Sequence, residues 1–270
     1  MKNIRLVIIL SIFVFFTLIV VLCSTVFTLN TVDLGWRTST KVLSDTTDNQ
    51  IISSAKFDIG ESVFLLNKQK YIDNLETNNP YLKVLGMEIK FPNKIKVSVS
   101  EREELYVLKV VNENAATGYS YVYLDYDLKV LKITDKEVQA NQTNPAILTL
   151  EGLNYTVNDF SAGQFTNLPV ENMLEAIGDM LSSTGYTNKL CKGLIKTINL
   201  KFDVDTTIDI LTTYGLNLRI MKAEDHTSQK VLKALSIYEY YHNTHPNINH
   251  GDITVYERDG LVVAAGPKVS

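Results

Sequence analysis

The sequence begins with an apolar run that fixes how the chain can be placed in a cell. The 22 residues from Leu6 to Phe27 carry no charge and are mostly apolar, and Lys2 and Arg5 precede them. A helix of this length, at about 1.5 Å per residue, spans the ~30 Å hydrocarbon core of a bilayer. We predict a transmembrane helix over 6–27 with a cytoplasmic tail over 1–5, because positive charges stay on the cytoplasmic side. The remaining residues are then extracytoplasmic.

Two other interpretations of this apolar segment stay open: a cleaved signal peptide and a lipoprotein signal. A cleaved signal peptide has a shorter apolar region, roughly 7–15 residues, which ends at a small-residue site. Here the uncharged stretch continues to Val32, and Cys23-Ser24-Thr25 is the nearest approach to such a site. Cys23 also permits a lipoprotein, although the bulky Leu22 stands where a small residue is expected. We favour an uncleaved anchor in the cell membrane.

The residues after the anchor are acidic overall. They contain all 30 acidic residues and 24 of the 26 basic ones, which gives them a net charge of −6. This charge argues against nucleic acid or anionic lipid as a main partner. Cys191 is the only cysteine outside the anchor, so an intramolecular disulfide is excluded. The folded part must rely on packing and sheet hydrogen bonds.

The first half of the soluble part contains a helix followed by a hairpin. We interpret residues 28–55, rich in Thr, Ser, Asp and Asn, as a membrane-proximal linker that leads into a short strand. Apolar residues at helical spacing predict a helix over Lys68–Thr77, with Asn67 as its N-cap. Alternating residues then predict a hairpin of Leu82–Lys90 and Lys94–Ser100, turning at Phe91-Pro92-Asn93.

Most later segments have the pattern of strands. A helix after Pro169 is predicted from Met173, Leu174, Ile177, Met180 and Leu181, and another near Thr227–Tyr241 is expected to bury Val231, Leu232, Leu235 and Tyr238. The Asp259-Gly260 pair predicts a tight hairpin at the end of the chain. The predicted strands are Leu105–Val111, Tyr119–Leu124, Lys129–Thr134, Ala146–Glu151, Leu194–Phe202, Thr206–Leu211, Gly215–Met221, Asp252–Glu257 and Leu261–Ala265.

A search for catalytic, cofactor and metal motifs finds none. His242 and His245 have a spacing that a metal could use, but no third ligand follows the pattern, and we interpret the four histidines as solvated. Cys191 lacks the context of a nucleophile. Asp203, Asp205 and Asp209 are close in sequence, and we prefer a wet sheet face or turn to a catalytic pair. Tyr119, Tyr121 and Tyr123 would share a sheet face, as an interface or as an ordinary cross-strand ladder. We therefore predict a binding protein, not an enzyme, with no cofactor and no metal.

An ordered series of motifs resembles the bacterial cell-division family FtsQ, called DivIB in Gram-positive bacteria. The stretches Gly60–Lys68, Asn79–Val84 and Phe91–Arg102 are similar to successive parts of the family's POTRA domain, and Glu103-Glu104-Leu105 departs from its usual Pro-Val-Ala. Later landmarks are Tyr123-Leu124-Asp125, Pro145–Leu148 with Gly152, and Gly215–Leu218. The resemblance implies an α+β protein with an anchor, a POTRA-like domain over 28–101 and a β domain over 102–270. This second domain is expected to be a mixed α/β domain with an antiparallel-rich sheet.

The resemblance also implies a non-enzymatic scaffold at the division septum. Such proteins bind the bitopic proteins FtsL and FtsB (DivIC in Gram-positive bacteria) near the end of the second domain. A terminal strand at a sheet edge suits this role, because its unpaired N–H and C=O groups can bind a partner strand. The candidate partner-binding residues are Ile253, Val255, Tyr256, Arg258, Leu261 and Val263; alternatively, these strands are simply the last hairpin of the core.

Other assignments remain open. Lys83, Lys90, Lys94 and Lys96 lie on the POTRA hairpin, either as a solvated face or as a docking patch for a second partner. The chain is alternatively an interaction module of another envelope assembly or secretion complex. A membrane-tethered wall enzyme is a further alternative, because paired carboxylates can assemble from distant positions.

Overall fold

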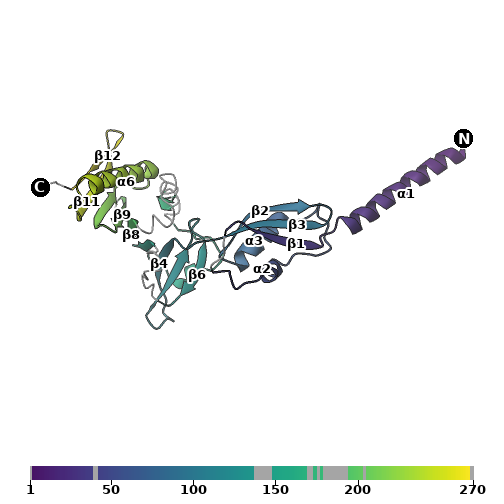
Figure 1. Ribbon diagram of the computed structural model, residues 1–270, viewed down its shortest axis with the longest axis horizontal. Coiled ribbons are helices and arrows are strands. Elements are labelled where there is room, and N and C mark those ends of the chain that lie inside the picture. Colours follow the sequence, from purple (N-terminus) through teal and green to yellow (C-terminus); the bar gives the residue numbers. More distant parts are fainter. Residues whose placement is uncertain are drawn as a thin grey trace. The chain divides into compact units, whose positions relative to one another are not determined.

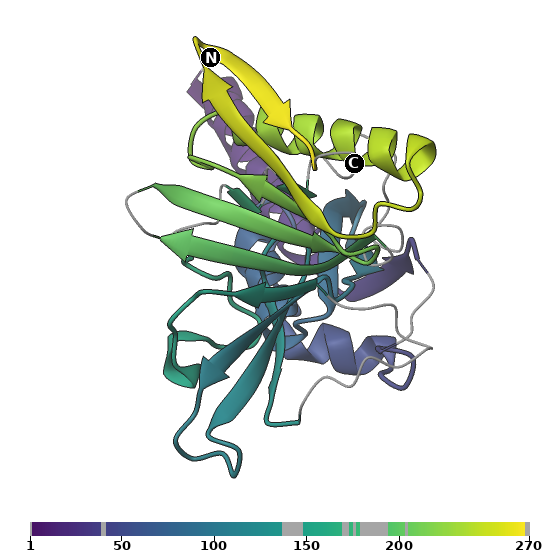
Figure 2. The same ribbon diagram turned by 90° about the vertical axis from the view of Figure 1, so that its left-hand side faces the viewer.

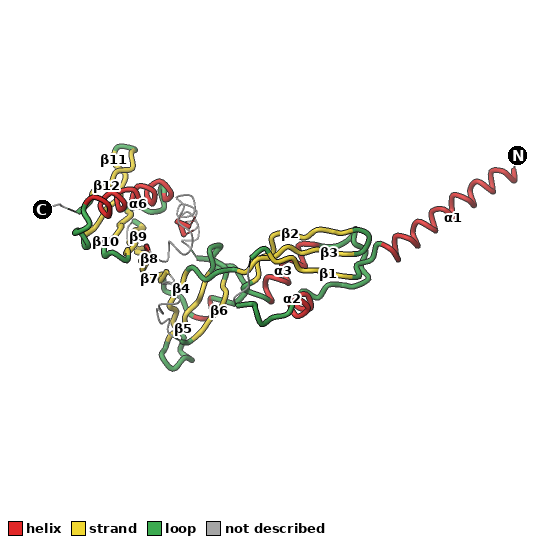
Figure 3. Tube along the Cα trace, viewed as in Figure 1, coloured by secondary structure: helices red, strands yellow, loops and turns green. Residues whose placement is uncertain are grey.

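The computed structural model describes residues 2–38, 42–136, 148–168, 173–174, 177–178, 194–202 and 205–267. The chain divides into two compact units, Met1–Arg102 (unit 1) and Glu103–Ser270 (unit 2). Figure 1 labels most of the helices and strands, and Figure 3 labels further strands of unit 2.

Helix α1 (Lys2–Val26) contains the predicted membrane span. Within the described residues, one helical stretch, Val7–Val26, has the length and composition needed to cross a bilayer. Its hydroxyl groups are satisfied inside the helix: Ser11 and Thr17 donate to the carbonyls of Val7 and Phe13, at 2.9 and 2.8 Å. A helix whose polar groups are paired in this way can be placed in lipid at low cost.

Unit 1 is a three-stranded sheet with two helices on one face (Figure 3). Strand β3 (Lys94–Glu101) lies in the middle, antiparallel to β2 (Leu82–Lys90) and parallel to β1 (Thr31–Trp36). Helices α2 (Asp48–Ser54) and α3 (Lys68–Asn78) contribute buried side chains to the same core as this sheet. The predicted helix and hairpin are confirmed.

The core of unit 1 follows the alternation seen in the sequence. Ile95, Val97 and Val99 of β3 are fully buried, whereas the residues between them are exposed or half-buried. They face Ile51 of α2 and Leu75 of α3. The expected N-cap of α3 is present, because the Asn67 side chain accepts a hydrogen bond from the Lys70 amide at 3.2 Å.

The interpretation of residues 28–55 as a linker is wrong. This segment contains β1 and α2, and Thr47 caps α2 through a reciprocal bond pair with Gln50. Strand β1 depends on pairing with β3, about sixty residues later in the chain, so its local composition does not indicate it. The backbone continues from α1 into the sheet with only a few residues between them.

Unit 2 is built on a mixed sheet, which has nine strands among the described residues in the order β12-β11-β10-β9-β8-β7-β4-β5-β6. Five of the eight neighbouring pairs are antiparallel and three are parallel. The α+β class and the antiparallel-rich sheet are confirmed. The strands are β4 (Tyr106–Val111), β5 (Tyr119–Leu124), β6 (Val130–Thr134), β7 (Leu148–Glu151), β8 (Ile195–Phe202), β9 (Thr206–Thr212), β10 (Leu216–Ile220), β11 (Gly251–Arg258) and β12 (Leu261–Ala265).

Helix α6 (Thr227–Thr244) packs on the end of this sheet that is formed by β10, β11 and β12 (Figure 2). Val231, Leu235 and Tyr238 are buried as predicted, but Leu232 is 46% exposed, and Ala234 is buried instead. A short helix η1 (Val157–Asp159) follows β7. The helix predicted after Pro169 lies largely outside the described residues, as does Cys191; Leu174 and Ile177 are buried in the core.

Candidate partner-binding surface

The last two strands form a tight hairpin whose register follows from its turn. Asp259 and Gly260 both have positive φ, 54° and 74°, which is the conformation of a type I′ turn. This turn places Arg258 opposite Leu261. The Asp-Gly signal in the sequence is confirmed at this position.

Strand β12 is one edge of the nine-stranded sheet in the described part of the chain. In a hairpin with a two-residue turn, the flanking pair is hydrogen-bonded and every second pair after it is bonded too. Arg258–Leu261 and Tyr256–Val263 are therefore bonded pairs. The N–H and C=O groups of Val262 and Ala264 then point away from β11, along the outer edge.

The six predicted partner-binding residues lie on two different faces. Ile253 and Val255 are fully buried core residues beneath α6. The cross-strand register places Tyr256, Arg258, Leu261 and Val263 together on the opposite face. Leu261 is 68% exposed there, while Val263 and Tyr256 are half-buried. The sequence pattern shows this alternation, but not which face α6 covers.

A buried lysine fastens α6 to the turn beside β11. Lys230 is fully buried, and its ammonium group donates to the carbonyls of Met221 and Lys222 at 3.1 and 2.6 Å. The Met221 amide donates to the Val255 carbonyl at 2.9 Å. The hairpin is thus supported by packing from α6 and by a hydrogen-bonded turn.

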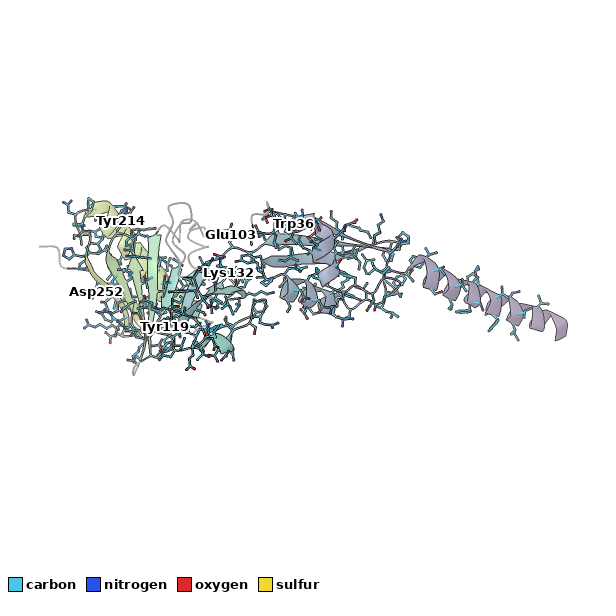
Figure 4. The ribbon with its side chains drawn as sticks, turned by 90° about the horizontal axis from the view of Figure 1, so that it is seen from below. Trp36, Glu103, Tyr119, Lys132, Tyr214 and Asp252 are labelled. Atoms are coloured by element: carbon cyan, nitrogen blue, oxygen red, sulfur yellow. The ribbon has the colours of Figure 1, made fainter. Side chains whose placement is uncertain are left out.

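A network of charged side chains crosses the outer face of the sheet next to the hairpin. Asp209 accepts from Lys201 at 2.5 Å and from Arg219 at 2.9 Å, and Arg219 also reaches Asp252 at 3.1 Å. Burial raises the pKa of Asp209, but hydrogen bonds from Arg219 and Lys201 outweigh it and hold the pKa below its ordinary value. The network connects β8, β9, β10 and β11; Asp252, at its end, is labelled in Figure 4.

Asp209 lies on a strand, as expected, but the prediction of a wet face is wrong for it, because it is buried beneath the side chains of Lys201 and Arg219. Asp205 forms a separate ion pair with Lys222, with 3.7 Å between the charged atoms. Asp203 lies outside the described residues. Two cations on one carboxylate keep it ionised, which suits a structural pair more than a proton-transferring acid.

The histidines are placed among aromatic rings or at the surface. His242, in the last turn of α6, stacks on Tyr238 and contacts Tyr214, with ring centroids 5.8 and 4.4 Å apart. His245 follows the helix end, and His226 and His250 are exposed. No cluster of three or more His, Cys, Asp or Glu side chains with the geometry of a metal site occurs within the described residues.

The tyrosine ladder on β5 lies beside a shallow hollow of about 380 Å³, lined by residues that include Val107, Lys109, Tyr121 and Glu151. Tyr123 packs against Val107 and Tyr121, so the ladder forms a small apolar cluster on this face. Lys132 lies over the Tyr123 ring at 4.0 Å. These contacts are those of an ordinary cross-strand ladder.

Three lysines of the β2–β3 hairpin lie together near its turn, where Lys90 is opposite Lys94 and Lys96 is opposite Glu88. Lys94 and Lys96 are exposed on β3, and Lys90 is paired with Glu88 at 2.7 Å on the surface. Lys83 is half-buried near the other end of β2. The three lysines near the turn are exposed and have Glu88 among them, as on a solvated sheet face.

Comparison with known proteins assigns part of unit 1 to a described domain family. A family model described as "POTRA domain, FtsQ-type" matches residues 41–102. The chain is 27% identical over 143 residues to a Clostridium acetobutylicum protein named "Cell division protein DivIB". The aligned residues make up 53% of this chain and 51% of that protein. It is 25% identical over 175 residues to a protein of the same name from Clostridium botulinum, covering 60% and 65% of the two chains. The matches therefore span about half to two thirds of these relatives.

Proposed function

Because the chain belongs to the FtsQ/DivIB family, we propose that it is a non-enzymatic scaffold of the bacterial cell-division machinery. In this role α1 anchors it in the cell membrane, with residues 1–5 in the cytoplasm and the residues after α1 outside, at the division septum. It binds FtsL-like and FtsB/DivIC-like bitopic proteins there and supports septal peptidoglycan synthesis. The observation that carries the proposal is the combination of a membrane-length helix, an FtsQ-type POTRA domain and a terminal hairpin with an open edge.

Partner binding uses the backbone of β12. A partner strand that lies beside β12 pairs with the outward N–H and C=O groups of Val262 and Ala264 and extends the sheet by one strand. Main-chain pairing supplies affinity and little selectivity, because every sequence has the same backbone groups. The type I′ turn and α6 hold the edge rigid before binding, which lowers the entropy that is lost on association.

Selectivity comes from the face that α6 leaves uncovered. Tyr256, Arg258, Leu261 and Val263 present an aromatic ring, a cation and two apolar side chains to alternate positions of a partner strand. Tyr and Arg often dominate binding energy when they become desolvated at an interface. Ile253 and Val255 are buried at 0% exposure, so they support the hairpin from within the core and take no direct part.

The first test is capture of partners by the full chain in detergent. Immobilised protein is expected to retain FtsL-like and DivIC-like proteins from solubilised membranes of the source cells, identified by mass spectrometry. Retention of components of another envelope complex, without any division protein, would contradict the divisome assignment. Wall-degrading activity in the purified chain would contradict the non-enzymatic role.

The second test removes the outer edge and keeps the hairpin. Ala264→Pro eliminates an N–H that points away from β11, so the pairing with β11 is retained, and proline is tolerated on edge strands. The matched control Ala264→Ser changes the side chain at the same position and keeps the N–H. We expect the proline variant to weaken partner binding at least about tenfold, which corresponds to ~1.4 kcal/mol. Deletion of the whole hairpin is a poorer test, because it removes two core residues.

The third test separates the side-chain contribution. Tyr256→Ala is expected to weaken binding roughly tenfold or more, in the range of interface hot spots. Tyr240→Ala is the matched control, since Tyr240 is a 55% exposed tyrosine on α6. Equal binding by Ala264→Pro, Tyr256→Ala and the unaltered chain, all folded by circular dichroism, would refute the hairpin as the contact and leave the family assignment intact.

A further inference from the structure

The end of α1 is fastened to unit 1 by backbone hydrogen bonds. The Phe27 carbonyl accepts from the Val63 amide at 2.9 Å, and the Leu29 amide donates to the Glu61 carbonyl at 2.7 Å. The Asn30 amide donates to the Asn93 carbonyl at 2.8 Å. Two turns of unit 1, at residues 60–65 and 91–93, are thereby held against the residues that directly follow α1.

These two turns present apolar side chains that the core does not use. The ring of Phe27 contacts those of Phe64 and Phe91, with centroids 5.3 and 6.3 Å apart, and the Phe64 and Phe91 centroids are 5.8 Å apart. Phe64 is 60% exposed, Leu65 80% and Phe91 64%. We call Phe27, Phe64, Leu65 and Phe91 the tip residues. A contiguous exposed patch of this kind marks an interaction site.

The position of the tip residues relative to α1 indicates what covers them. The membrane-length stretch ends at Val26, and Phe27 is the next residue. A span of 20 residues matches the hydrocarbon thickness, so Phe27 lies at the boundary between acyl chains and headgroups. Phe64 and Phe91 touch Phe27 and so lie at the same depth. Figure 1 shows the β2–β3 turn at the end of unit 1 from which α1 leaves.

We propose that the tip residues insert into the outer headgroup–acyl boundary of the bilayer that α1 crosses, and that they dock unit 1 on the membrane. The occupant of the patch is lipid: aromatic and leucine side chains are the ones that enter this boundary, to a depth of about 5–10 Å. The attraction is apolar and does not require anionic lipid, in keeping with the acidic charge of the body. The inference rests on the membrane crossing of α1 in the proposed function, and not on any division partner.

Docking of this kind sets the direction of unit 1. Strand β1 begins at Thr31, beside the tip, and runs to Trp36; five residues of strand cover about 16 Å. Trp36 is the only tryptophan in the chain. It is labelled in Figure 4 and lies at the end of β1 that is remote from α1. The native chain thus contains an internal reference probe outside the lipid.

The test is quenching of tryptophan fluorescence in the full chain, reconstituted into phosphatidylcholine vesicles with and without lipid brominated near the headgroup end of the acyl chains. Phe91→Trp, in a Trp36→Phe background, is expected to lose roughly half of its emission, since a side chain at this depth lies beside the bromines. Trp36 in the native chain is expected to keep its emission. Phe15→Trp in the same background, in vesicles whose lipid is brominated near the methyl end of the acyl chains, reports whether α1 is inserted, because residue 15 lies near the middle of the span.

A charge on the tip supplies the matched comparison. Leu65→Glu, added to the Phe91→Trp probe, is expected to abolish most of the quenching, because a carboxylate resists the acyl boundary. Leu85→Glu is the control: Leu85 is 52% exposed in the middle of β2, away from the turn. Both substitutions lie on exposed leucines, so both variants retain the core of unit 1.

The outcomes distinguish the two proposals. Quenching at residue 15 without quenching at residue 91 overturns the docking and leaves the membrane anchor in place, with the tip facing water or protein. Absence of quenching at residue 15 overturns the membrane crossing and the docking together. Quenching at residue 91 that Leu65→Glu leaves unchanged also overturns the tip assignment.

Discussion

A buried ion pair closes unit 1 and gives the sharpest prediction about its stability. The Arg102 guanidinium donates to Glu76 at 2.8 Å and to the Leu82 carbonyl at 3.1 Å. Glu76 accepts from the Val84 amide at 2.7 Å through its other oxygen. The side chains of Arg102 and Glu76 are 3% and 12% exposed. The pair therefore joins the end of α3 to the start of β2 and to the residue that ends the unit.

Arg102→Met keeps the apolar stem and removes the charge. Breaking one partner of a buried pair costs about 3–5 kcal/mol, because the remaining buried charge loses its ion-pair partner. With a urea slope of about 2 kcal/mol per molar, the unfolding midpoint of unit 1 should fall by roughly 1.5–2.5 M. Adding Glu76→Gln removes the second charge and keeps an oxygen for the Val84 amide. The double variant is expected to regain about 1–2 kcal/mol of the loss.

The single tryptophan reports this transition. Trp36 packs on the core of unit 1, and its indole N–H donates to Asp48 at 2.9 Å, so its emission changes when the unit unfolds. Urea titrations of the full chain in detergent give the midpoint for each variant. The control is Lys90→Met, which breaks an exposed pair with Glu88 and should leave the midpoint unchanged. If Arg102→Met shifted the midpoint no more than Lys90→Met, the reasoning from burial would be refuted.

Three further predictions concern single side chains. Hydrogen bonds outweigh burial and lower the folded-state pKa of Asp209, so the ionised side chain stabilises the fold above the ordinary carboxylate pKa, and this stability is lost as the pH falls through the folded-state pKa. Asp209→Asn should therefore reduce the loss of thermal stability at acid pH, measured by circular dichroism. Burial and a hydrogen bond to Glu61 raise the pKa of Tyr71 to about 12, so native stability should fall between pH about 10 and 12, and Tyr71→Phe should remove that loss in the same assay. Gly152→Ala should destabilise unit 2 by about 3 kcal/mol or more in urea titration, because φ is +84° and the new Cβ would lie 1.8 Å from the Leu200 carbonyl oxygen; an unchanged midpoint would refute this contact.

Local signals in the sequence were sufficient where one segment determines its own structure. The alternation through Ile95, Val97 and Val99 predicted β3 and its buried face, and Asp259-Gly260 predicted the terminal turn. Asn67 predicted the start of α3. In each case a short pattern of side chains selects both the backbone geometry and the direction of the core, so no distant residue is needed.

The missed features depend on contacts far apart in sequence. Strand β1 forms because β3 supplies its hydrogen bonds, and the polar composition of residues 28–55 suggested a linker instead. The side chains of Lys201 and Arg219 both reach Asp209 because of the register in which β8, β9 and β10 pair, and the sequence alone does not give that register. Leu232 fits the apolar face of α6 by spacing but is exposed, while the buried lysine at 230 occupies the position that periodicity assigns to an apolar residue.

The two proposed contacts act through different physics, and this makes them separable. The hairpin edge binds by backbone pairing in unit 2, whereas the tip residues partition into lipid from unit 1. Substitutions at Leu65 and Ala264 share no partner side chain, so their effects on the affinity for a division partner in detergent solution should be additive. Leu65→Glu alone should hardly change that affinity. In a membrane, docking restricts the positions that a tethered chain samples and changes its effective concentration toward a tethered partner. Leu65→Glu should therefore alter partner binding in vesicles while leaving it unchanged in detergent, an effect that an altered binding edge would not produce.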